Sequence, residues 1–231
     1  MGYEPLVKQN PLRVLKNGTD SGWEMGLIMA RPGLGKTALL VQIALDTILL
    51  GNRVIHVSIG ESIDKTRAWY DDMIRHILQE HSVDRPHDLI DMVQRHRMIM
   101  TFKETTFTRS KLEERLNDMI MQDIFKPNCL VVDGFDFSDA DRQNLKELRE
   151  MAEAMSMQIW FSAVSHREDK RFSAAGVPAP CHEMDDLFDT VILIKPEEGK
   201  IRLHVVKNKG KAVASDLGLD LDPSTMMIKK S

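Results

Sequence analysis

Cysteine is scarce in this sequence, and its two cysteines, Cys129 and Cys181, lie far apart. Such a pair matches neither the closely spaced clusters that bind zinc nor the disulfide framework of small secreted proteins. Cys129 lies within an apolar run and is best explained as a small residue of the core. We therefore expect a protein of a reducing compartment, the cytoplasm.

Long apolar segments and a strong excess of one charge are missing as well. No apolar run is long enough to span a bilayer, and residues 1–5 contain no apolar region of the signal-peptide kind. We expect no contact with a membrane. The net charge is −4 and charged residues make up 29% of the chain. Charge alone therefore does not require a nucleic-acid partner, although a local basic patch would still allow one.

The 231 residues are enough for one α/β domain with a buried central sheet. Apolar, β-branched runs alternate with segments of helical periodicity. We expect strands at 26–30, 54–59, 98–102, 129–133, 159–164, 190–194 and 201–206, and helices at 36–50, 62–79, 108–122 and 139–155. We expect a loop and a short helix over 81–97, either an edge strand or a helix over 11–15, and at most one more strand over 218–228. This order predicts a mainly parallel sheet flanked by helices, with an antiparallel extension at the C-terminal end.

A glycine-rich stretch follows the first expected strand and leads into the first long helix. It comprises Arg31, Pro32, Gly33, Leu34, Gly35, Lys36, Thr37 and Ala38. Strand, glycine-rich loop and helix are the context of a phosphate-binding loop of the G-x-x-x-x-G-K-[ST] type. The first position of that pattern is Ala30 instead of Gly, and a chance Gly-Lys-Thr is the alternative reading.

A loop of this kind would bind a nucleoside triphosphate, for which we expect ATP with Mg²⁺. Its glycines would let backbone N–H groups face phosphate oxygens, and the helix N-terminus would add its positive dipole end. Lys36 would then contact the β- and γ-phosphates, and the Thr37 hydroxyl would bind Mg²⁺.

Two carboxylates follow expected strands at the edge where this loop lies. Asp133 ends the 129–133 strand, where it could bind Mg²⁺ through water or could only cap the next turn. Glu61 follows the 54–59 strand, where it could activate the attacking water or could only stabilise the N-terminus of the next helix.

Three further features carry candidate binding groups. Ser162, Ser165 and His166 lie at the end of the 159–164 strand and either sense the γ-phosphate or belong to a solvated loop. Lys207 and Lys209 belong to a basic hairpin that supplies cations to phosphate or is simply solvated. Residues 167–183 have the composition of a mobile loop with few apolar anchors, and Arg167, Lys170 and Arg171 make the segment a candidate for contact with single-stranded DNA or a partner protein.

The glycine-rich stretch with its Ala-Arg-Pro opening resembles the phosphate loop of DnaB-type replicative helicases. Those proteins belong to the RecA-like ATPases, as do the KaiC-type ATPases. Segments 57–62, 131–133, 161–167 and 205–210 resemble, in this order, the family's catalytic-glutamate strand, second nucleotide motif, sensor strand and finger hairpin. Together they cover about residues 22–215, so the resemblance implies one RecA-like domain over 1–231.

The same comparison reveals departures from the family pattern. Aligned on the DnaB type, the catalytic glutamate position is Gly60, and Glu61 matches the second of two adjacent acids in the KaiC type. The sensor glutamine is not found, and Lys209 stands where arginine is usual. The resemblance implies ATP binding with slow hydrolysis in a head-to-tail homo-oligomer, in which Lys207 and Lys209 act on a neighbouring subunit. A nucleotide-dependent binding module without hydrolysis is the alternative. A small-molecule kinase is a weaker reading, because no arginine-rich lid follows the sensor strand.

Overall fold

The computed structural model of the protein describes residues 3–16, 23–166, 168–197 and 199–230. The turn cluster at 17–22 and Arg167, both singled out in the sequence, lie outside these residues. The fold is built on one mixed sheet, in which ten strands are assigned over the described part of the chain. Parallel strands form its core, as the alternation of elements predicts.

The parallel part contains the first six strands. These are β1 (Glu24–Ala30), β2 (Val54–Ile59), β3 (Arg97–Phe102), β4 (Cys129–Asp133), β5 (Gln158–Val164) and β6 (Thr190–Glu197). They lie in the order β3-β2-β4-β5-β1-β6, so β1 is flanked by β5 and β6. All six residues of β2 are buried, because helices cover both of its faces.

The remaining strands are antiparallel and extend the sheet beyond β6. They are β7 (Lys200–Asn208), β8 (Lys211–Ala212), β9 (Leu219–Leu221) and β10 (Ile228–Lys230). The path runs β6-β7-β9-β10, and β8 pairs with β7. Expecting at most one strand over 218–228 was wrong: Leu219, Leu221 and Ile228 are buried in the core, and this burial holds two short strands in place.

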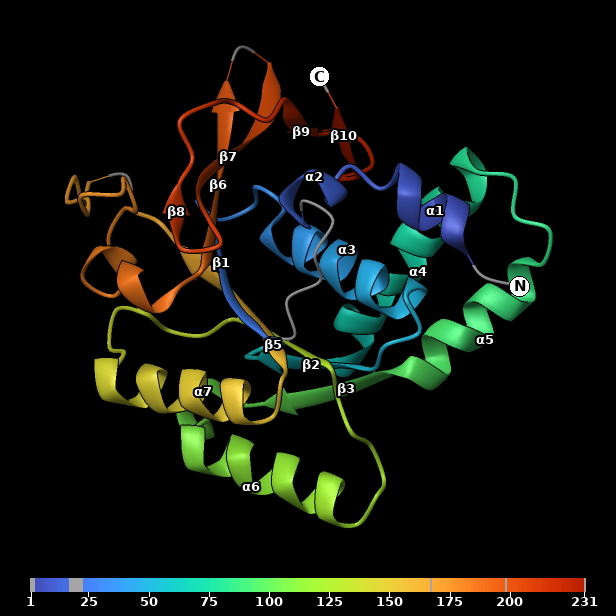
Figure 1. Ribbon diagram of the computed structural model, residues 1–231, viewed down its shortest axis with the longest axis horizontal. Helices are drawn as coiled ribbons and strands as arrows, with labels where there is room; N and C mark the ends of the chain where they lie inside the picture. Colours follow the sequence, from blue (N-terminus) through green and yellow to red (C-terminus); the bar gives the residue numbers. More distant parts are fainter. Residues whose placement is uncertain (1–2, 17–22, 167, 198, 231) are drawn as a thin grey trace.

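Helices cover the two faces of the sheet in separate groups (Figure 1). The helices are α1 (Glu4–Gln9), α2 (Arg13–Lys16), α3 (Lys36–Leu49), α4 (Ile63–Glu80), α5 (Pro86–His96), α6 (Arg109–Met121) and α7 (Arg142–Ala154), with the short 3-10 helices η1 (Glu104–Thr106), η2 (Cys181–Glu183) and η3 (Asp185–Leu187). One core cluster joins α3, α4 and α5 to the sheet, and a second joins α6 and α7 to its opposite face. The sequence of segment 11–15 fits either a strand or a helix. In the structure, residues 13–15 belong to helix α2.

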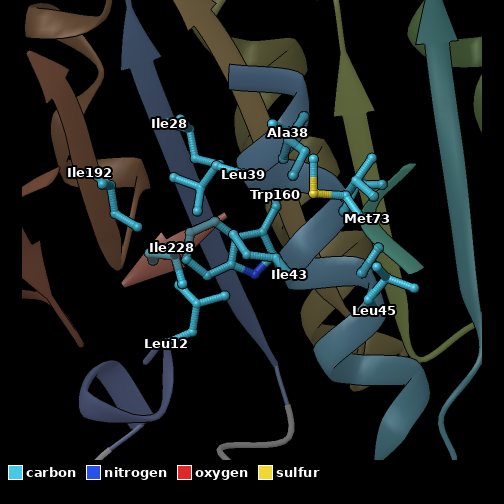
Figure 2. Close-up of a cluster of buried hydrophobic side chains, with 14 of the residues drawn as sticks. Leu12, Ile28, Ala38, Leu39, Ile43, Leu45, Met73, Trp160, Ile192 and Ile228 are labelled. Carbon is cyan, nitrogen blue, oxygen red and sulfur yellow. The ribbon is translucent and has the colours of Figure 1, made fainter. Parts of the chain in front are cut away.

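Helix α3 lies at the centre of the first cluster (Figure 2), where Leu39 and Ile43 pack with Ile28 of β1 and Trp160 of β5. The indole of Trp160 lies over Gly26, where a β-carbon would approach the Trp160 ring to 2.3 Å. The chain therefore needs a glycine at this point of β1. This packing fixes α3 against β1 and so fixes the loop that joins them.

The segment 168–183 differs in part from the expectation of a loop with few anchors. Val177, Ala179 and Cys181 are fully or almost fully buried, and Phe172 forms an isolated bridge with Pro178. Its second half is thus packed on the core beside η2. The residues with exposed side chains, which include Lys170 and Arg171, lie in the first half.

Candidate functional site

The glycine-rich loop (residues 31–35) leaves the carboxyl end of β1 and ends at the first residue of α3. Gly33 and Gly35 have φ angles of +80° and +90°, in the left-handed region that glycine adopts without strain. Gly35 is the N-cap of α3, and it provides no side chain to cap the helix. The first N–H groups of α3 are consequently left for another acceptor, at the positive end of the helix dipole.

Lys36 turns back over this loop. Its Nζ donates long hydrogen bonds of 3.4 Å to the carbonyls of Ala30 and Arg31. Burial lowers the pKa of Lys36, and the negative charge of Asp133 opposes this effect. A half-buried ammonium held by two weak contacts is well placed to exchange them for an anion.

Asp133 connects the first turn of α3 to the end of β4. The Thr37 hydroxyl donates to Asp133 Oδ2 at 2.6 Å, and the Ser162 hydroxyl of β5 donates to Asp133 Oδ1. The sequence placed Thr37 and Asp133 at one metal site, and the structure brings them into direct contact. The next residue, Gly134, has a φ of +84°, and a β-carbon there would lie 2.3 Å from the Ile59 carbonyl oxygen.

These oxygen groups suit a hard divalent cation such as Mg²⁺, because it prefers hydroxyl, carboxylate and water ligands. Within the described residues no group of three or more His, Cys, Asp or Glu side chains could hold a metal by itself. A cation at Thr37 and Asp133 would therefore take most of its ligands from water and from a bound phosphate.

A cavity of about 740 Å³ opens beside these residues at the carboxyl edge of the sheet. Lys36, Asp133 and Ser162 line one part of it, and Glu104, Phe107 and Arg109 line another. Its wall is completed largely by residues 134–141, which follow β4. The chemical groups at Lys36 and Asp133 therefore face a space large enough for a ligand and solvent.

Other residues predicted for the site lie at its margin. Glu61 is exposed, and its Oε1 pairs with Lys65 Nζ at 2.5 Å in front of the N-terminus of α4. The Ser165 N–H donates to the Ala30 carbonyl at 3.0 Å, and His166 is exposed. None of these three is among the described residues that line the cavity.

Lys207 and Lys209 lie at the opposite edge of the sheet. Lys207 pairs with Val191, which pairs with Leu27 at the middle of β1. The turn that contains Lys209 and Gly210 lies nearer the start of β1, because the Gly210 N–H donates to Asp189, whose own N–H donates to Met25. The glycine-rich loop, in contrast, follows the end of β1. The Lys207 Nζ donates to the Asp185 carbonyl at 2.8 Å. These two lysines therefore do not belong to the cavity of their own chain.

Lys170 and Arg171 lie in the exposed first half of the segment 168–183. Arg171 forms an ion pair with Asp169 at 2.6 Å, and this carboxylate neutralises part of the local positive charge. Lys170 is exposed. The segment offers a weaker cationic surface than its sequence indicates.

A buried polar cluster behind Asp133 was missed by sequence reasoning. His56 of β2 is fully buried, and its Nδ1 lies 3.0 Å from the Tyr70 hydroxyl. Arg97 lies over the Tyr70 ring at 4.4 Å from its centroid. Burial lowers the pKa of His56 to about 4; Asp133 opposes this shift and Arg97 adds to it. A histidine within a strand that is apolar apart from Ser58 was the sequence signal that could have marked this cluster.

No known protein-family model matches this chain, and no curated protein matches it significantly. Within the described residues no helix is both long enough and apolar enough to cross a membrane.

The neutral His56 predicts a specific dependence of stability on pH. Its folded pKa of about 4 lies below the ordinary value of 6.5, so between these values the unfolded chain binds more protons. The free energy of unfolding should therefore fall as pH drops from 6.5 to 4, by up to about 1.4 kcal/mol per pH unit from this group. Urea unfolding across this range measures the slope, and His56→Gln should flatten it. Equal slopes in the two proteins would contradict the assignment.

Proposed function

We propose that this protein binds ATP with Mg²⁺ at the glycine-rich loop. The observation that carries the proposal is the joint placement of three groups: the uncapped N-terminus of α3, Lys36, and the Thr37 hydroxyl at 2.6 Å from Asp133. Backbone N–H groups, an ammonium and a cation site together match the charges of a triphosphate and its metal ion.

A triphosphate fits this combination better than a monophosphate does. The N–H groups and Lys36 can each contact different phosphoryl groups, and Thr37 and Asp133 would hold a Mg²⁺ that neutralises part of the phosphate charge. The adjacent cavity of about 740 Å³, which Lys36 and Asp133 help to line, is large enough to hold water beside a bound phosphate. This arrangement supports hydrolysis as the reaction, in which the protein contributes chiefly by positioning and charge.

The finer assignment, a RecA-like ATPase of DnaB or KaiC type, rests on the order of its motifs along the chain. The parallel core, the loop after β1 and the acid at the end of β4 are compatible with it. We propose on this basis that the chain acts in a head-to-tail homo-oligomer. Lys207 and Lys209 are not among the residues that line the cavity, and the hairpin turn after them lies toward the start of β1, away from the loop. We therefore expect them to reach a nucleotide only on a neighbouring subunit.

The substrate of such an ATPase would be single-stranded DNA or a partner protein. The first, exposed half of 168–183 is the surface we assign to this contact, with Lys170 and Arg171 as the cations. Because Arg171 is already paired with Asp169, binding to nucleic acid should be weak and sensitive to salt.

The alternative is a binding module in which ATP sets an interface without being hydrolysed. The pairing of Glu61 with Lys65 favours it, because Glu61 is not among the described residues that line the cavity and its carboxylate already has a cationic partner. Both the ATPase and the binding module would bind ATP, but only the ATPase would hydrolyse it.

Removing the loop ammonium tests the binding site. Lys36→Ala should abolish measurable ATP binding in calorimetry, because the charge-assisted contacts of Lys36 to phosphate are lost. Lys146→Ala, a change at an exposed lysine of α7 paired with Glu150, is the control and should leave the affinity unchanged. If Lys36→Ala binds ATP as tightly as the parent protein does, the loop is not the binding site.

The rate of ATP hydrolysis per subunit should rise with protein concentration. A cation supplied by a neighbour compensates transition-state charge and can be worth on the order of 10³-fold in rate, with lysine at the low end of such effects. Lys207→Ala and Lys209→Ala should flatten the rise and leave ATP affinity unchanged. A substantial rate that is constant on dilution, with only monomer in sedimentation, would exclude a cation from a neighbour.

A further inference from the structure

Glu104 shares the cavity with the groups assigned to ATP. The lining of this cavity includes Lys36 and Asp133 as well as Glu104, which begins η1 just after β3. The sequence offered no pattern that marks Glu104, since it stands in a polar stretch between an expected strand and an expected helix. Only the fold brings its carboxylate to the same edge as the glycine-rich loop.

The carboxylate of Glu104 lies over the backbone of Gly60, at the carboxyl end of β2. A β-carbon built on Gly60 would be 2.5 Å from Glu104 Oε1 and 3.0 Å from its Cδ. Any other residue at 60 would also be strained by the φ of +82°. The missing side chain at the end of β2 therefore leaves the space that the carboxylate of Glu104 occupies.

Glu104 differs from Glu61 in what its carboxylate contacts. Within the described residues the Glu104 side chain has no hydrogen-bond or ion-pair partner, whereas Glu61 is paired with Lys65 at 2.5 Å. Glu104 lines the cavity and Glu61 does not. An unpaired carboxylate facing the space beside Lys36 and Asp133 is the better acceptor for a proton released there.

Aromatic packing holds the segment that carries Glu104. Phe107, at the end of η1, contacts Phe102 of β3 at 5.3 Å and Phe135 after β4 at 5.9 Å between ring centroids. The N–H groups of Thr106 and Phe107 both donate to the Lys103 carbonyl at 3.0 Å. The turn is thereby fixed to the two strands on either side of β2.

We propose that Glu104 is the general base of ATP hydrolysis at this site. In this step a water oxygen bonds to the γ-phosphorus while one water proton passes to a Glu104 carboxylate oxygen. The bond between the γ-phosphorus and the β,γ-bridging oxygen breaks, and ADP leaves with its electron pair. Inorganic phosphate and ADP are the products, and Glu104 then releases its proton to solvent. This inference rests on the ATP site proposed above.

The test compares turnover with ATP affinity in Glu104→Gln. Turnover per subunit should fall by 10²- to 10⁴-fold, the usual worth of a general base, because the amide keeps the shape and does not accept the proton. ATP affinity by calorimetry should stay within about threefold, and bound ATP should be recovered intact after acid quench. Glu114→Gln, an equivalent change at an exposed position of α6, is the matched control and should retain parental turnover.

The possible outcomes distinguish a wrong role for Glu104 from a wrong ATP site. Parental turnover in Glu104→Gln, or a comparable loss in Glu61→Gln with Glu104→Gln unaffected, would overturn the role of Glu104 and leave ATP binding intact. Binding of ATP by the parent protein without turnover at any protein concentration would also overturn it. Failure of the parent protein to bind ATP at all would overturn the ATP site itself. Far-ultraviolet circular dichroism confirms that each variant is folded.

Discussion

The hydrogen bond from the Thr37 hydroxyl to Asp133 is the contact on which the site depends, because it joins the first turn of α3 to the end of β4. Thr37 lies in the helix that follows β1, and Asp133 ends β4. Between β1 and β4 lies β5, whose Ser162 donates to the other oxygen of the same carboxylate. The first turn of α3 and the ends of β4 and β5 are thus tied together at one edge of the sheet. A cation that replaced these hydroxyl contacts would act on all three at once.

The packing behind this edge keeps the contact in register. Trp160 fills the space over Gly26 and packs with α3, so the helix that carries Thr37 cannot slide along β1 without opening the core. Buried His56 and Tyr70 form a polar contact behind Asp133, and the low pKa of His56 keeps that contact uncharged. The glycines at 60 and 134 then let backbone and carboxylate groups approach closely where the strands end. Close packing thereby surrounds the polar contacts of Lys36, Thr37 and Asp133, which a bound ligand could replace.

Sequence patterns were sufficient to predict the parallel core of the sheet and the position of Lys36 and Thr37 at the start of a helix, because each of these depends on local chemistry. β-Branched runs predict buried strands, and glycine followed by Lys36 and Thr37 predicts a tight turn into a helix that glycine adopts without strain. The short strands β9 and β10 were underestimated, since their stability comes from tertiary burial of Leu219, Leu221 and Ile228. The sequence could not predict the place of Glu104 for a related reason. Its position depends on the pairing of β3 with β2 and on the space above Gly60, and no local sequence pattern encodes either feature.

The central claim is that the glycine-rich loop holds a triphosphate, and a crystal structure grown with Mg²⁺ and a non-hydrolysable ATP analogue tests it most directly. The account predicts the β- and γ-phosphates at the N-terminus of α3, with Lys36 Nζ moved from the Ala30 and Arg31 carbonyls onto phosphate oxygens. It also predicts Mg²⁺ bound to the Thr37 hydroxyl, with Asp133 contacting it directly or through water. Nucleotide bound elsewhere, or a loop that stays empty at saturating analogue with Lys36 still on the two carbonyls, would contradict it.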